Sequence, residues 1–257
     1  MSRGISPRPS ASPPRSGGAI TARLLAGNSA RERIQHALAE QHLRAAGKLT
    51  DRQRDSAEWA HVQFALGLVL NEQGRYPDAL AVFREIVQEQ TRVLGPRHRD
   101  VLLSRLWLGI ALREDGHYEL AERELREVVA LNQAVQGREH ADTLKSRNNL
   151  ANALYAQDKN AEAEQENREV LAIRERVLGK DHPDVFQSAG NLALALESQG
   201  RLEEALVFAQ RAEEGRKRVF GEEHPDSQEA RKLREKIAAA LAKEKTNGPA
   251  SGTEVGK

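Results

Sequence analysis

The amino-acid sequence predicts an all-α protein built as a solenoid of antiparallel helix hairpins. Two observations carry this prediction: a sequence pattern that recurs every 42 residues, and a composition dominated by residues that favour helices. Aromatic residues make up only 4% of the chain, and residues that favour strands are scarce. The abundant small side chains instead permit close contacts between helices.

Three motifs keep the 42-residue period over four copies without an insertion or deletion. The first motif has the copies GPRHRD (95–100), GREHAD (137–142), GKDHPD (179–184) and GEEHPD (221–226). The second has the copies GRYPDAL (74–80), GHYELAE (116–122), DKNAEAE (158–164) and GRLEEAL (200–206). The third is a pair of leucines four residues apart: Leu66 and Leu70, Leu108 and Leu112, Leu150 and Leu154, Leu192 and Leu196. Such agreement indicates four copies of one structural unit.

Each unit has the pattern of two helices, which we name helix A and helix B. In the third copy, helix A is predicted to run roughly from His140 to Gln157, and helix B from the turn at 158–160 to about Leu178. Gly179 suits the left-handed position that ends a helix, and Pro183 fits the first turn of the next one. The residues expected to face the core are Leu150, Ala151 and Leu154 on helix A, and Ala163, Val170, Leu171 and Val177 on helix B.

The repeat phase extends beyond the four hairpins at both ends. Residues 29–47 are predicted to form a lone helix B, because Ile34, Ala37 and Leu38 lie one period before Tyr76, Ala79 and Leu80. Residues from about 225 to 244 are predicted to form a lone helix A that covers the last open core face. We therefore expect a solenoid over 29–245, a disordered basic tail over 1–28 and a second disordered tail over 246–257.

Composition excludes several classes of function. The chain has no cysteine, so disulfides, thiolate nucleophiles and cysteine-based metal sites are excluded. Five of its 39 Lys and Arg residues lie within the first 31 residues, which contain no acid, so the remainder carries 34 basic against 38 acidic residues. The folded body is therefore not expected to bind nucleic acid. No run approaches the roughly 18 consecutive apolar residues of a membrane span.

The cellular location is expected to be cytoplasmic. The alternative is an organelle, since residues 1–31 are rich in Ser and Arg and free of acids, as in a transit peptide. The four prolines and three glycines of residues 1–18 disfavour an amphipathic presequence helix.

The third and fourth copies resemble tetratricopeptide repeats of the 42-residue kinesin-light-chain type. The segments that carry the resemblance are NNLANALYAQDKNAEAEQENREVLAIRERVLGKDHPDV (148–185) and NLALALESQGRLEEALVFAQRAEEGRKRVFGEEHPDS (191–227). The resemblance covers about 29–243 and implies a right-handed superhelix whose helices A line a concave groove. It also implies that an asparagine before the Leu-Ala pair, here Asn149 and Asn191, contacts the backbone of a ligand. The first two copies depart from this pattern, with Ala65 and Trp107.

A stripe of polar residues on one helix A is the most distinctive candidate site. Lys145, Asn148, Asn149 and Asn152 are spaced i, i+3, i+4 and i+7, on a face distinct from the Leu150 and Leu154 stripe. Asparagine is a poor residue in the middle of a helix, and its amide can bond an extended peptide backbone whatever the side chains of that peptide. An ordinary solvated face is the alternative, but Glu, Lys or Arg would serve it better.

Three further residues are candidates for the groove. Trp107 occupies the position of Asn149 one repeat earlier, and either packs between hairpins or anchors a ligand. Arg113 and Tyr155, which are equivalent positions of successive repeats, could flank the groove.

The four repeated histidines are not expected to bind a metal. Equivalent positions of stacked repeats lie roughly 8–10 Å apart, whereas zinc ligands all lie about 2 Å from one ion. We interpret them as turn residues: His98, His140, His182 and His224.

The sequence thus predicts a non-enzymatic scaffold or adaptor for protein–protein interaction, with no metal and no cofactor. Its partner is expected to be a peptide or extended protein segment bound in the groove of the helices A, and not nucleic acid, a membrane or a small-molecule cofactor. The alternative is a structural or oligomerisation module that assembles through its convex face or its ends and binds no peptide.

Overall fold

The computed structural model describes residues 35–50, 52–53 and 56–247, so the predictions made for 1–28 and 248–257 lie outside the described residues. All regular structure in the described part is helical. A first helix covers residues 35–49. The others are α2 (Ser56–Glu72), α3 (Tyr76–Leu94), α4 (Arg99–Glu114), α5 (Tyr118–Gln136), α6 (Ala141–Tyr155), α7 (Asn160–Leu178), α8 (Pro183–Glu197), α9 (Leu202–Phe220) and α10 (Pro225–Asn247).

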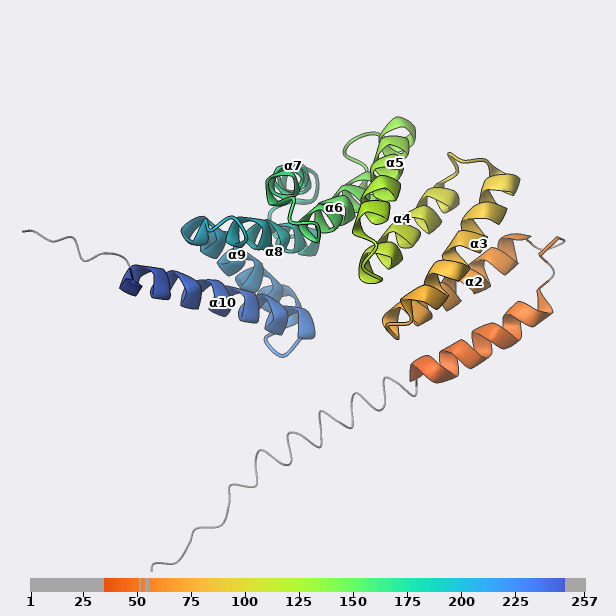
Figure 1. The fold of residues 1–257 in the computed structure, drawn as a ribbon, viewed down its shortest axis with the longest axis horizontal. Helices are drawn as coiled ribbons and strands as arrows, with labels where there is room; N and C mark the ends of the chain where they lie inside the picture. The colour runs from red at the N-terminus through yellow and green to blue at the C-terminus, as the bar shows by residue number, and fades with distance from the viewer. Residues whose placement is uncertain (1–34, 51, 54–55, 248–257) are drawn as a thin grey trace, which may run out of the picture.

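These helices form an all-α repeat solenoid, as the sequence predicts. Four hairpins, α2–α3, α4–α5, α6–α7 and α8–α9, stack one after another, with the helix at 35–49 before them and α10 after them (Figure 1). The helices A are therefore α2, α4, α6, α8 and α10, and the others are helices B. Each helix packs mainly on the helices that precede and follow it in the chain. The structure is thus a one-dimensional array in which neighbouring units share their interfaces.

The repeated Gly…His motif marks the junction between one hairpin and the next. His98, His140 and His182 each cap the start of a helix A, because the ring Nδ1 accepts a hydrogen bond of 3.2 Å from the backbone N–H two residues later. The predicted turn residues are therefore N-caps. Gly179 ends α7 with φ 86° and ψ 155°, a combination open almost only to glycine, and not the compact left-handed conformation expected from the sequence.

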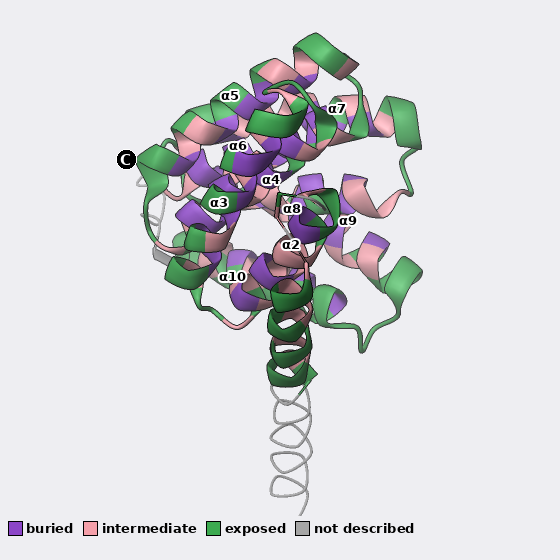
Figure 2. Ribbon diagram, turned by 90° about the vertical axis from the view of Figure 1, so that its right-hand side faces the viewer, coloured by how far each residue is buried: buried purple, intermediate pink, exposed green. Residues whose placement is uncertain are grey.

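The apolar core lies where the helices face one another (Figure 2) and forms two clusters. One cluster spans the first two hairpins and reaches α6, Ala163 and Ala195. The other holds Leu171, Ile237 and the remaining clustered residues of α8 and α9. They meet at the third hairpin, where many buried side chains are polar: Thr143, Ser146, Arg147, Asn148, Asn167 and Arg174. The third hairpin therefore buries more polar side chains than any of the other three hairpins.

Two details of the sequence prediction are wrong. Val177 is 47% exposed, because α7 has 19 residues and its last turn extends past the 15-residue helices α6 and α8. The last helix continues to Asn247, so residues 246–247, assigned to the tail, are helical.

Ion pairs hold neighbouring helices B together in the second half of the array. Glu122 of α5 accepts hydrogen bonds from Lys159 (2.6 Å), Gln157 (2.8 Å) and Arg126 (2.9 Å). Desolvation raises the pKa of the Glu122 carboxyl, but these hydrogen bonds together outweigh it and bring the pKa from 4.5 to about 2. One repeat later, Glu164 has equivalent partners in Arg168, Gln199 and Arg201, and its pKa is also lowered.

Glu122→Gln is expected to destabilise the protein at neutral pH and to matter less in acid. The folded-state pKa lies below the unfolded one, so the contribution of Glu122 is present above pH 4.5 and is lost as pH falls towards about 2. We expect a loss of about 1–2 kcal/mol at pH 7, less than the full shift because solvent screens the group. Urea unfolding at pH 7, 4 and 3 measures it, with the exposed Glu119→Gln as control. A loss that does not shrink in acid would contradict this account.

Candidate functional site

Side chains of successive helices A touch one another in a continuous row. Phe64 of α2 meets the ring of Trp107 of α4 edge-on, with centroids 6.4 Å apart, and Lys145 Nζ of α6 lies 5.6 Å from the same ring. Further along, Asn191 of α8 bonds two asparagines of α6, and Lys236 of α10 pairs with Glu197 of α8 at 2.8 Å. We name this surface the A-helix row. It contains most of the predicted site residues: Trp107, Lys145, Asn148, Asn149, Asn152 and Asn191.

Trp107 is partly buried and packs between the first two hairpins, which is one of its two predicted roles. Its ring stacks on Phe83 with centroids 6.3 Å apart and an interplanar angle of 20°, and Phe64 lies at its edge. Lys145 is exposed and places its ammonium group over the remaining ring surface, an arrangement that favours a cation–π contact. The indole therefore packs against the first hairpin and still contributes an aromatic surface to the row.

The predicted asparagine stripe is an amide cluster between α6 and α8. Asn191 Nδ2 donates to Asn148 Oδ1 at 3.2 Å and to Asn152 Oδ1 at 3.0 Å. Asn148 is only 3% exposed, so the prediction that it faces a ligand does not fit its burial. Asn148 instead supports Asn191, because its buried Oδ1 accepts the hydrogen bond that holds the Asn191 side chain in place.

Hydrogen-bonding capacity remains on the half-buried members of this cluster. Asn149 donates its amide to the Lys145 carbonyl at 2.9 Å, which leaves its Oδ1 without a partner in the described part of the chain. The same holds for the Nδ2 group of Asn152 and for Asn191 Oδ1. Each amide offers two N–H donors and two lone pairs, so these three residues keep both donors and acceptors for a ligand.

Arg113 and Tyr155 are less closely tied to the row. Arg113 pairs with the adjacent Glu114, and no described contact joins it to the other candidates. Tyr155 lies near α8, where Ser198 Oγ donates to its hydroxyl at 3.4 Å. The structure therefore links Tyr155 to α8 through Ser198, and Arg113 has no described contact with the other candidates.

Sequence analysis missed a ladder of buried polar bonds between hairpins. Each bond joins one position of a helix B to a serine 14 residues later: Gln90 with Ser104 (2.8 Å), Asn132 with Ser146 (2.9 Å) and Arg174 with Ser188 (2.8 Å). The signal was present, because both positions keep the 42-residue period. These bonds satisfy buried groups at the hairpin interfaces and so have a structural role.

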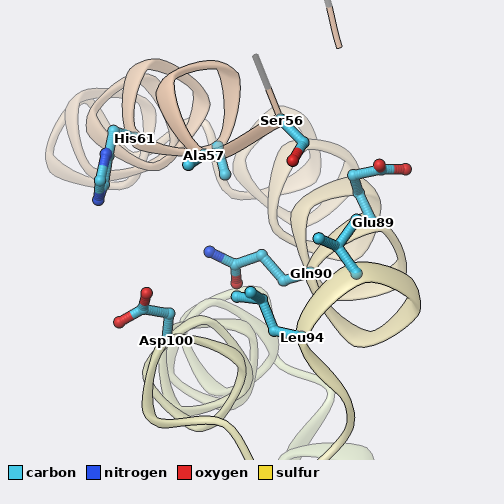
Figure 3. A pocket seen from close by; sticks show the side chains of 9 residues that line it. Ser56, Ala57, His61, Glu89, Gln90, Leu94 and Asp100 are labelled. Atoms are coloured by element: carbon cyan, nitrogen blue, oxygen red, sulfur yellow. The ribbon is translucent and has the colours of Figure 1, made fainter. Parts of the chain in front are cut away.

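A cavity of about 90 Å³ lies between α2, α3 and α4 (Figure 3). Its lining includes Ser56, His61 and Asp100, residue types found in hydrolytic triads, but no hydrogen bond connects them in the described structure. Its buried carboxylate, Glu89, is neutralised by Arg92 and Arg52, which lower its pKa despite desolvation. The cavity is therefore a gap between hairpins that shows no catalytic arrangement.

Two negative findings apply to the described residues alone. They contain no group of three or more His, Asp or Glu side chains that could hold a metal ion. None of their helices is long and apolar enough to cross a membrane.

The repeat fold defines the class of the protein, a helical repeat scaffold for protein–protein interaction. Tetratricopeptide repeat models match residues 55–134, 143–184 and 185–226. The chain belongs to the tetratricopeptide repeat family, a non-enzymatic repeat family, and its repeats are of the kinesin-light-chain type. No curated protein matches the sequence significantly.

Several solved structures are similar to this chain. Nearly identical TPR-like repeats from Podosopora anserina, assigned to a kinesin light chain, are 26% identical over 71% of this chain and 95% of theirs, with a TM-score of 0.57. BtubC (BKLC) from P. vanneervenii is 17% identical over 88% of this chain and 96% of its own, with a TM-score of 0.60. A Rap protein complexed with Competence and Sporulation Factor is 15% identical over 86% of this chain and 65% of its own, also with a TM-score of 0.60. The last two likenesses concern the fold alone.

Proposed function

We propose that the protein is an adaptor that binds an extended segment of a partner protein along the A-helix row. The observation that carries this proposal is the set of half-buried amides with unused capacity: Asn149, Asn152 and Asn191. An extended segment presents backbone N–H and C=O groups that amides can bond without regard to side chains. Other side chains of the A-helix row would then distinguish one partner sequence from another.

The rest of the row supports this proposal through its varied chemistry. Trp107 with Lys145 offers an aromatic and cationic surface before the amides, and Glu197 with Lys236 offers charges after them. The helices B from α5 to α9 instead pair much of their charge with one another, as in the contacts of Glu122 and Glu164. A protein of similar fold, the Rap protein, was solved in complex with Competence and Sporulation Factor.

Asn149→Ala together with Asn191→Ala is expected to lower the affinity for a bound segment at least about tenfold. Each lost bond that leaves a ligand group unsatisfied costs about 1–3 kcal/mol, and 1.4 kcal/mol is a factor of ten. The probe is a set of 12-residue peptides selected from a random phage-displayed library on the full chain. Affinity is measured by fluorescence anisotropy of the synthetic peptides.

The matched control removes two exposed amides from helices B, with Gln165→Ala and Gln210→Ala. It should leave the affinity within about twofold, since neither residue lies in the A-helix row. Thermal melting of both double variants corrects for stability, because Asn191 also bonds Asn148 and Asn152. Equal losses in both variants would contradict binding along the row.

The alternative function, a structural or oligomerisation module, has its own supporting observation. The last turns of four helices B present repeat-equivalent valines that are each 43–49% exposed: Val93, Val135, Val177 and Val219. Exposed apolar residues aligned along an edge are a feature of contact surfaces. Concentration-dependent sedimentation, combined with a peptide library that yields no binder, would favour this alternative.

A further inference from the structure

Gly190 is a glycine in the middle of α8 that helix packing does not require. Glycine is among the least favourable residues inside a helix. The other glycines of the hairpin helices have a steric reason, since an added Cβ would lie 2.8 Å from the Phe83 ring at Gly67 and 2.7 Å from Leu125 at Gly109. At Gly190 the nearest atom to such a Cβ is Ala212 Cβ at 3.8 Å, an ordinary contact.

The missing side chain of Gly190 leaves a cavity of about 100 Å³ beside Asn191, a member of the A-helix row. The preceding repeats fill this position with Phe64, Leu106 and Asn148. The cavity lies between α8, α9 and α10, and its apolar lining consists of Gly190, Leu194, Ala212, Ala230 and Leu233. Helix α8 thus lacks a side chain where a hydrophobic one would fill a space between three helices.

Three polar residues complete the lining, and two of them are held by the protein. Asn191 bonds Asn148 and Asn152, and Arg216 Nη1 donates to the Asp226 carbonyl at 3.1 Å. The third, Glu229, is exposed. The interior of the cavity is therefore suited to an apolar group, and polar groups lie around it.

We propose that this cavity is a specificity socket that receives one aliphatic side chain, of valine to leucine size, from the segment bound along the A-helix row. A dry apolar cavity of about 150 Å³ admits benzene, so one of 100 Å³ suits an aliphatic group and is too small for an aromatic ring. Asn191 adjoins the socket and bonds the segment's backbone beside that side chain. The inference rests on the proposed function, and it adds the class of residue that the partner must carry.

The test uses the selected 12-residue peptides and the full chain with Gly190→Leu. The new side chain would occupy the socket as Leu106 occupies the same position two repeats earlier. Peptide affinity is expected to fall at least about tenfold, the loss that follows from excluding one buried aliphatic side chain. The melting temperature should rise by about 2–4 °C, because a glycine is replaced inside a helix and a cavity is filled. A packing role alone would change stability without changing affinity.

The peptides supply the reciprocal test. Those selected on the wild-type chain should share one Val, Ile or Leu, and its replacement by Gly or Trp should weaken binding to wild type but not to the Gly190→Leu variant. Peptides that bind wild type and Gly190→Leu equally, yet lose affinity with Asn149→Ala and Asn191→Ala, would overturn the socket and leave the proposed function standing. If peptide affinity does not change with Gly190→Leu, Asn149→Ala or Asn191→Ala, both the socket and the proposed function are overturned. A library that yields no binder would overturn both as well. Gly190→Ala adds a single methyl group, which fits beside Ala212, so it should lower peptide affinity much less than Gly190→Leu does.

Discussion

Removal of α10 is expected to cost the array about 4 kcal/mol of stability or more. Ile237 and Ala230 are buried against the fourth hairpin, and burial of one large aliphatic side chain contributes about 1.5–3 kcal/mol. The truncation also breaks the Arg234–Glu213 (2.6 Å) and Lys236–Glu197 (2.8 Å) ion pairs, and it exposes the core face of α8 and α9. A chain that ends at His224 should melt about 8–16 °C lower and tend to aggregate.

A chain that ends at Asn247 is the control, since it retains every described contact of α10. Its melting temperature should match that of the full chain. Circular dichroism gives the melting curves, and light scattering gives the association state. If the chain ending at His224 stayed monomeric with an unchanged melting temperature, α10 would not be a cap of the solenoid.

Gly215→Ala is expected to destabilise the protein by about 1–3 kcal/mol. An added Cβ at this position of α9 would lie 2.5 Å from Cγ of Phe186 and closer to two other ring atoms. Phe186 is 2% exposed, so its ring cannot move without disturbing the fourth hairpin. Overpacking of this kind outweighs the gain of up to about 1 kcal/mol from placing alanine in a helix.

Gly190→Ala is the matched control, because it is the same substitution in the partner helix of the same hairpin. Its Cβ would meet only Ala212, at 3.8 Å, so it should stabilise the protein by about 0.5–1 kcal/mol. Opposite signs in urea unfolding of the two variants are the expected result. A stabilising Gly215→Ala would show that the contact between α8 and α9 is looser than the structure indicates.

The sequence predicts the fold well because each helix of the repeat occurs in four equivalent copies, so that a pattern seen in one copy can be checked in the other three. Helix α6 runs from Ala141 to Tyr155 where His140 to Gln157 is predicted, and α7 ends at Leu178 as expected. The error at Val177 has a physical cause, since apolar periodicity does not reveal that one helix is longer than its neighbours. Backbone conformation at Gly179 was likewise predictable only as a positive φ.

The sequence predicts which residues of the candidate site share one face of a helix, but not the contacts that they make with the next helix. Spacing places Asn148, Asn149 and Asn152 together on α6, but it does not show how α8 lies against them. The bonds of Asn191, and the burial of Asn148, depend on that relative placement of two helices. Gly190 was visible in the sequence, yet only the empty space beside it distinguishes it from a glycine required by packing.

The most direct test of the central claim is to locate a bound peptide on the solenoid. A selected 12-residue peptide carrying a nitroxide label at one end is added to the isotope-labelled full chain, and the line broadening of backbone amides is measured by NMR. The account predicts broadening along the A-helix row, at Trp107, Asn149 and Asn191 according to which end is labelled, with little effect at Gln165 and Gln210. Broadening centred on the helices B, or on the exposed edge at Val135 and Val177, would contradict it.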